Sequence, residues 1–204
     1  MLRTLRTDGP ALAVRRTGGG PAARVHLVGT AAGPVGGDEV EVRLVVGPEA
    51  CLEVAGVAAT LVLPSADEPR SRLLLDVVVG EGGRLVCALP PVVVTGRAAL
   101  DATTRVRLDA GAQVRLVEHV RLGRHAEPGG WWRGRTDVVR DGRPLLRQTT
   151  TLGEDPDDGL RELRSVLDTA PVPTDGRRDG PHDDPARTVV MDLAAGGTLT
   201  VTLG

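Results

Sequence analysis

Alternating apolar and polar residues recur along the chain and predict a protein built mainly of β-strands. The clearest unit covers residues 33–54, where a glycine-rich turn closed by Asp38 precedes an alternating strand, a turn at 47–50 and a second alternating stretch. Strict alternation places one face of each strand in a core and the other face in water. The Gly-Pro pair that opens the turn at 47–50 favours a chain reversal.

The same unit returns three more times, with turns at residues 80–83, 109–112 and 194–197. The first three turns begin at residues 47, 80 and 109, which is a near-constant spacing. A further hairpin is predicted at Asp141-Gly142, between strands at 134–140 and 144–152. We therefore expect stacked antiparallel hairpins in a β-helix-like or sandwich architecture.

The remaining segments carry weaker signals. Strands are expected at 11–15 and 22–28, and a strand continues from the organising unit through 55–63. Acidic residues at 157–158 precede apolar positions 160, 163, 166 and 167, which predicts one short helix near 159–168. Residues 169–187 are rich in Pro, Gly and Asp, so 153–187 is expected to be this helix plus a mobile acidic loop. With a weakly ordered start at 1–20, the whole chain 1–204 is predicted to form a single domain.

Composition narrows the class of protein. The chain has 204 residues, of which 41% are hydrophobic and 25% charged, as in an ordinary globular protein with a core. A net charge of -2 gives no general electrostatic reason to bind nucleic acid. No apolar run approaches the ~20 residues of a membrane span, and the start resembles no signal peptide. We therefore expect a cytoplasmic protein with no membrane partner. Cys51 and Cys87 are expected to be buried thiols.

No catalytic motif is evident in the sequence. It contains no G-x-S-x-G, no phosphate loop ending in Gly-Lys and no H-E-x-x-H. The Gly-Gly-Gly run at 18–20 lacks the strand–helix context of a dinucleotide site. His182-Asp183-Asp184 is interpreted as a solvated acidic loop rather than a cation site. No catalytic constellation therefore stands out.

Glu118 and His119 stand out in the otherwise apolar strand LVEHVRLGR. Neighbours in a strand point to opposite faces, and alternation with Val114 and Leu116 sends Glu118 inward. An inward carboxylate must be paired, protonated, or in contact with water or a metal. Two interpretations stay open: an ion pair with a core-facing Arg, and a polar passage for a cation or water. Asp38 is either a turn-closing carboxylate that accepts backbone N–H bonds or a second acidic group of that passage.

Four stretches, in order, resemble motifs of the urease accessory protein UreD (UreH) family and cover about residues 22–152. GPVGGDEVEVRLVVGPEACLEV is similar to the opening G-G-x-V-G-G-D motif, and LVCALPPVVV is similar to L-E-W-L-P-Q-E. VRLVEHVRLGR is similar to L-L-x-W-E/D-x-x-x-L-G-R, and DVVRDGRPLLRQTTTL is similar to D-G-x-P-L-L-x-E-R-x-x-L. The resemblance implies a mostly β fold with stacked strands and few helices.

The resemblance also implies a function. UreD proteins are non-enzymatic scaffolds that bind apo-urease and, with UreF and the GTPase UreG acting through UreF, support nickel insertion. A water-filled passage has been proposed to carry nickel through the family fold. Asp38 and Glu118 match acidic positions associated with that passage. We therefore expect transient nickel at these residues and no tightly bound cofactor.

The sequence departs from the family pattern at polar positions. An acidic residue of the family falls on Gln148, a Glu falls on Cys87, and the G-A-S/T-K segment becomes 56–60 with Ala59 in place of a polar residue. The closing helical region expected of the family has no matching stretch. Two alternatives remain: a generic β-solenoid protein-binding domain, and a metal-dependent hydrolase that uses Asp38, Glu118 and His119. The hydrolase requires three or more converging ligands with an open position.

Overall fold

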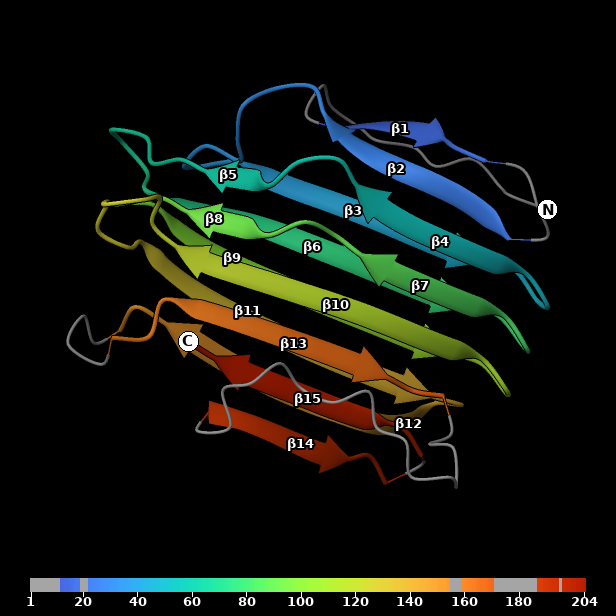
Figure 1. Ribbon diagram of the computed structural model, residues 1–204. Coiled ribbons are helices and arrows are strands. Elements are labelled where there is room, and N and C mark those ends of the chain that lie inside the picture. Colours follow the sequence, from blue (N-terminus) through green and yellow to red (C-terminus); the bar gives the residue numbers. More distant parts are fainter. Residues whose placement is uncertain (1–11, 19–21, 155–158, 171–186, 195) are drawn as a thin grey trace.

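A computed structural model describes residues 12–18, 22–154, 159–170, 187–194 and 196–204. These residues form two β-sheets that pack face to face, and no α-helix occurs among them (Figure 1). The expectation of a mostly β protein with stacked, β-helix-like strands is therefore confirmed. Two predicted segments lie largely outside the described residues. They are the weakly ordered start, of which 1–11 and 19–20 are not described, and the acidic loop, of which 171–186 are not described. His182-Asp183-Asp184 also lies outside the described residues.

The larger sheet lies in front in Figure 1 and contains ten strands. They are β1 (Leu12–Arg16), β2 (Ala23–Gly29), β4 (Cys51–Gly56), β5 (Thr60–Val62), β7 (Arg84–Ala88), β8 (Val92–Val94), β10 (Gln113–Leu122), β13 (Glu162–Asp168), β14 (Thr188–Asp192) and β15 (Thr198–Leu203). Their order is β1-β2-β4-β7-β10-β13-β15-β14, with β5 paired to β8 and β8 paired to β10. The strands expected at 11–15 and 22–28 are β1 and β2, each shifted by one residue.

The smaller sheet contains five strands in the order β12-β11-β9-β6-β3. They are β3 (Glu39–Val46), β6 (Arg70–Val79), β9 (Ala99–Leu108), β11 (Trp131–Arg140) and β12 (Arg143–Leu152). β11 and β12 form the expected antiparallel hairpin at Asp141-Gly142. The expected pairing of the last two strands is also confirmed, since β14 and β15 are antiparallel, although Ala195 in their turn is not described.

The turns at 47, 80 and 109 do not close antiparallel hairpins, so this part of the prediction was wrong. Each turn carries the chain from the smaller sheet to the larger one, and β3, β6, β9 and β11 then pair in parallel. The turns stack through backbone hydrogen bonds, with Gly80 N donating to Val46 O at 2.8 Å and Asp109 N to Val79 O at 3.0 Å. Alternation and turn residues predict a reversal, but they do not specify which strands pair across it.

The short helix predicted near 159–168 is a strand. β13 pairs antiparallel with β10 on one side and with β15 on the other. Leu163 and Leu167 are buried, in agreement with a period of two that also brings Ser165 inward. Their spacing of four residues fits a helix face equally well, so the sequence alone was ambiguous. The backbone N–H and C=O groups of β10 and β15 need partners on the sides that face residues 162–168. A strand in this place supplies those hydrogen bonds and a helix does not.

The continuous strand expected at 55–63 is interrupted, because β4 ends at Gly56 and β5 begins at Thr60. The core between the sheets is built mainly of Leu and Val, since the chain contains no Phe and no Tyr. Trp132 is its largest fully buried side chain. A Cβ atom on Gly134 would lie 2.2 Å from the Trp132 ring, so a glycine is required beneath it. Cys87 is buried as expected, whereas Cys51 is exposed.

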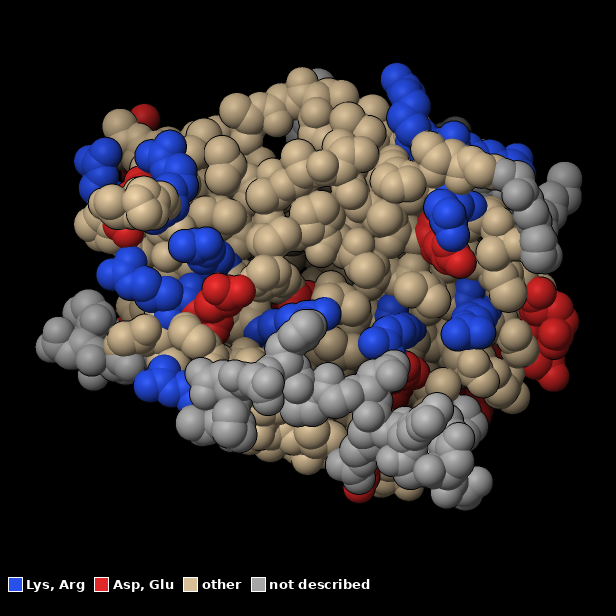
Figure 2. Space-filling model, in the orientation of Figure 1, with Lys and Arg blue, Asp and Glu red and all other residues tan. Residues whose placement is uncertain are grey.

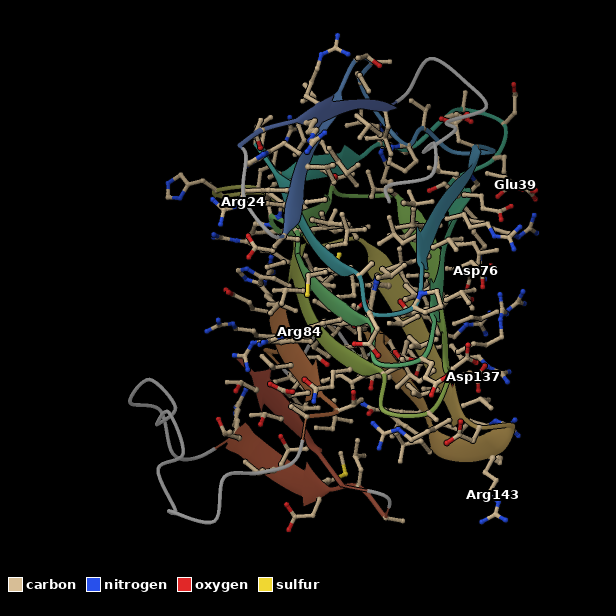
Figure 3. The ribbon with its side chains drawn as sticks, turned by 90° about the vertical axis from the view of Figure 1, so that its right-hand side faces the viewer. Arg24, Glu39, Asp76, Arg84, Asp137 and Arg143 are labelled. Atoms are coloured by element: carbon tan, nitrogen blue, oxygen red, sulfur yellow. The ribbon has the colours of Figure 1, made fainter. Side chains whose placement is uncertain are left out.

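The outer face of the smaller sheet carries rows of ion pairs that cross several strands (Figure 3). Asp76 on β6 lies 3.5 Å from Arg43 and 3.0 Å from Arg107, and Asp137 on β11 contacts Arg135 and Arg147. Alternation explains this face, because each charged residue lies between two residues that point inward, such as Leu75 and Val77 on either side of Asp76. Among the described residues, no helix is long and apolar enough to cross a membrane.

Candidate functional site

A cavity of about 120 Å³ lies between the two sheets. Residues of β3, β6, β9, β11 and β12 line it from the smaller sheet, and residues of β7, β8, β10, β13 and β15 line it from the larger sheet. Much of the wall is apolar, including Leu73, Leu75, Leu116 and Trp132. A single water needs roughly 10–15 Å³ of such space, so the cavity has room for several waters.

One region of the cavity wall is polar. On the larger sheet, Glu118 and Ser165 are direct register partners across β10 and β13. On the smaller sheet, Thr136 pairs with Thr104 on one side and with Gln148 on the other, which makes a polar row across three strands. Gln148 Nε2 also donates to Thr150 Oγ1 at 2.9 Å. One carboxylate and several neutral oxygen atoms therefore line the same cavity.

Glu118 faces the interior, as the alternation predicted, since Leu116 and Val120 on either side of it are buried. Within the described part of the chain, its carboxylate makes no hydrogen bond and no ion pair. No described arginine therefore serves as the partner that the ion-pair interpretation requires. Burial without a compensating cation raises the pKa of Glu118 from 4.5 to about 7. The carboxylate is therefore poised to gain or lose a proton near neutral pH.

His119, the next residue, lies on the opposite side of the sheet. Its Nε2 atom is 2.5 Å from Glu162 Oε1 on β13, so it belongs to a surface pair between adjacent strands. Both side chains are partly exposed, and such pairs contribute modestly to stability. His119 and Glu118 therefore do not present their side chains to a common ligand.

Asp38 is exposed at the end of the loop that precedes β3. Its Oδ2 atom accepts a hydrogen bond from Val35 N at 2.8 Å, which is the turn-closing role weighed for it above. The residues that line the cavity do not include Asp38. The structure therefore does not bring Asp38 and Glu118 together. Among the described residues, no group of three or more His, Cys, Asp and Glu side chains is arranged to hold a metal ion.

Two of the positions that depart from the family pattern line the cavity, namely Cys87 and Gln148. Burial raises the pKa of the Cys87 thiol to about 12, so this sulfur stays protonated at neutral pH and is a poor metal ligand. The third position, Ala59, is exposed in the connection between β4 and β5. The cavity wall therefore has fewer ionisable groups than the family pattern implies.

Sequence reasoning missed the neutral polar residues of the cavity. They are Thr104, Thr136, Thr150 and Ser165. Each occupies an inward position in an alternating strand, and Thr104 and Ser165 lie between apolar neighbours that point the same way, whereas Thr150 has Gln148 on one side. That pattern was available in the sequence, but only the pairing of β9 with β11 and of β11 with β12 shows that three strands contribute to one row.

Comparison with known proteins points to a family. The model of the UreD urease accessory protein family matches residues 1–174. Urease accessory protein UreD 1 of Saccharopolyspora erythraea is 42% identical over 159 residues, which is 76% of this chain and 62% of that protein. UreD of Streptomyces coelicolor is 40% identical over 154 residues, covering 75% of this chain and 60% of that protein. UreD of a Parafrankia strain is 38% identical over 157 residues, which is 77% of this chain and 53% of that protein.

The chain thus spans about three fifths of the length of the first two of these relatives. The matched region contains the whole smaller sheet, and it contains β10 and β13 with Glu118 and Ser165. The polar residues of the cavity therefore belong to the part of the molecule that the family model describes, whereas Leu199 of β15 lies beyond it. On the strength of this match and of the curated relatives, the chain belongs to the UreD urease accessory protein family.

Proposed function

We propose that this protein is a non-enzymatic scaffold that supports nickel insertion into urease. The relatives that it matches are urease accessory proteins. Its partners in this proposal are apo-urease, UreF and, through UreF, the GTPase UreG. A cytoplasmic location follows from the same proposal. Because the chain spans only part of the relatives' length, these partners are inferred from family membership.

The surface of the larger sheet supports a role in protein binding. Uncharged residues cover much of its outer face over β4, β5, β7 and β8 (Figure 2). Leu61 of β5 is 39% exposed, and Val57, in the connection between β4 and β5, is 61% exposed. Exposed apolar patches of this kind are typical of protein–protein contacts. The generic protein-binding alternative shares this feature, so the patch supports a scaffold without identifying the partner.

Glu118 is the single observation that carries the nickel proposal. It is an inward carboxylate without a partner among the described residues, and it lines a cavity that also contains Ser165, Thr136 and Gln148. A group kept for stability alone would be apolar here, because an unpaired buried carboxylate costs free energy. In our proposal, ionised Glu118 and the neutral oxygens hold nickel transiently. Nickel prefers nitrogen donors, so contact with oxygens is weak enough to allow release.

Asp38 takes a different place in this proposal. It lies outside the cavity and is held in its turn by Val35. If nickel approaches along the surface, this exposed carboxylate is available to attract it before it reaches Glu118. The proposal requires no stable site that includes both residues, and nickel is treated as cargo throughout.

The test is maturation of urease in cells in which this protein replaces the resident family member. Glu118→Gln keeps the shape of the side chain and removes its charge, so we expect the nickel content of purified urease to fall at least about tenfold. Two variants serve as matched controls. Glu41→Gln removes an exposed carboxylate on β3, and His119→Ala removes the chain neighbour of Glu118 on the outer face.

Both control variants are expected to give normal nickel content, and co-purification of urease with the Glu118→Gln protein should be unchanged. Normal nickel content with Glu118→Gln would contradict the passage. Loss of co-purification would show instead that Glu118 acts through complex formation. If the wild-type protein does not support maturation at all, the scaffold proposal itself fails.

A further inference from the structure

The last strand at one edge of the larger sheet carries three consecutive exposed apolar residues. Val189 is 57% exposed, Val190 is 42% exposed and Met191 is 40% exposed. They form the centre of β14, between Thr188 and Asp192. Half of the six exposed large hydrophobic residues found in the described part of the chain therefore lie in one five-residue strand.

Among the described residues, one edge of β14 has no strand partner, and side chains on both of its faces are partly exposed. Within the described part of the chain, β14 pairs with β15 only and ends the strand order of the larger sheet, at the bottom of Figure 1. Met191 lies opposite Leu199, whose side chain is buried between the sheets, so Val189 and Met191 share that inner face. Their exposure shows that the smaller sheet does not cover β14 on that side.

A free edge of this kind attracts another strand, because its unpaired N–H and C=O groups form a template for pairing. Natural edge strands are commonly protected by Lys, Pro or a bulge. β14 has none of these within Thr188–Asp192, and its pairing with β15 is regular over all five residues. An apolar and unprotected edge is the signature of an interface rather than of a solvated surface.

We propose that β14 pairs with β14 of a second copy of this chain, antiparallel and centred on Val190. The order of residues in the strand is self-complementary about that position. Val189 then lies opposite Met191 of the partner copy, Thr188 lies opposite Asp192, and the two Val190 residues lie opposite each other. A twofold axis repeats each contact, as an isologous interface requires.

The sequence of β14 favours a second copy over an unrelated strand. The three apolar residues are flanked on both sides by a polar one, so the same register buries every apolar side chain against another. No like charges lie opposite each other in this register, since Asp192 faces the hydroxyl group of Thr188 in the partner copy. The two larger sheets become one continuous sheet across the dimer, and the inference does not depend on the function proposed above.

The test is the mass of the full chain in solution, measured by light scattering after size exclusion at several protein concentrations. The wild-type chain is expected to form dimers whose fraction rises with concentration. Val190→Lys places two like charges directly opposite each other at the axis, so the dimer dissociation constant should rise at least about tenfold. Val190→Glu should do the same. Val45→Lys is the matched control, because Val45 is a 52% exposed valine on β3, the edge strand of the smaller sheet.

Mixing Val190→Lys with Val190→Glu distinguishes loss of the β14–β14 pairing from misfolding of the variants. Lys and Glu are then opposite each other, and we expect dimers to return in an equimolar mixture of Val190→Lys and Val190→Glu. Circular dichroism should show that each variant keeps the wild-type fold. A wild-type chain that stays monomeric at all concentrations would overturn the inference, as would dimers that persist in Val190→Lys. A mixture that stays monomeric would also overturn it, because the register centred on Val190 would then be wrong.

Discussion

Glu118 and His119 are neighbours in β10, yet their side chains lie on opposite faces of the larger sheet. Glu118 lines the cavity between the sheets, whereas His119 contacts Glu162 on the outer face. The separation follows from the period of two in a β-strand and holds whatever the rest of the fold does. It means that two residues adjacent in sequence lie in different environments, and on the inner face burial raises the pKa of Glu118 to about 7.

Glu118 should make the stability of the protein depend on pH between about 4.5 and 7. Its pKa in the folded state, about 7, is above the ordinary value of 4.5, so the folded protein binds the proton more tightly. The contribution of Glu118 to stability is therefore greatest below pH 4.5. It falls as the pH rises toward 7 and then levels off. The shift corresponds to about 3 kcal/mol in the free energy of unfolding.

Urea unfolding of the wild type and of Glu118→Gln, at pH 5 and at pH 8, measures this effect. We expect Glu118→Gln to be less sensitive to pH, and to be more stable than the wild type at pH 8. The other strongly shifted carboxylate, Glu127, has its pKa lowered to about 2 by Arg124, so it stays ionised throughout this range. Equal pH dependence in both proteins would show that Glu118 is hydrated or paired in solution.

The isolated protein should bind nickel weakly, with a dissociation constant above about 1 μM. The cavity offers one carboxylate and neutral oxygens, and Cys87 remains a thiol because burial raises its pKa to about 12. Nickel prefers nitrogen donors, and among the described residues of the cavity the one histidine, His119, has its side chain paired with Glu162 on the outer face. Titration calorimetry at pH 7.5 would measure the affinity. A stoichiometric site with a sub-micromolar dissociation constant would contradict both this prediction and the idea of transient contact.

Gly134→Ala should destabilise the protein by about 1–3 kcal/mol, as overpacking of a core does. The added Cβ atom would lie 2.2 Å from two carbon atoms of the fully buried Trp132 ring, so the ring or the backbone has to shift. Gly47→Ala is the matched control, since a Cβ atom there has no neighbour within 4 Å. Thermal melting followed by circular dichroism compares the two. Equal melting temperatures would show that the Trp132 ring moves without cost.

The sequence by itself determined the local features of this protein. Alternation predicted the strands, the inward direction of Glu118 and the outward direction of His119, because the direction of a strand side chain depends only on its position in the strand. Turn residues predicted the reversals at 47, 80, 109 and 141. The motifs from 22 to 152 indicated the UreD family, and the family match confirms that prediction.

The tertiary structure decided which strands are neighbours. A turn such as 47–50 can close a hairpin or lead from one sheet to the other, and the choice depends on whether strands far away in the chain offer better pairing. The same competition made β13 a strand, because β10 and β15 supply backbone partners on both sides. Ser165 reaches Glu118 across a sequence separation of 47 residues, and no local pattern encodes that contact. Local geometry fixes the direction of a side chain, but its environment depends on the backbone hydrogen bonds of the whole sheet.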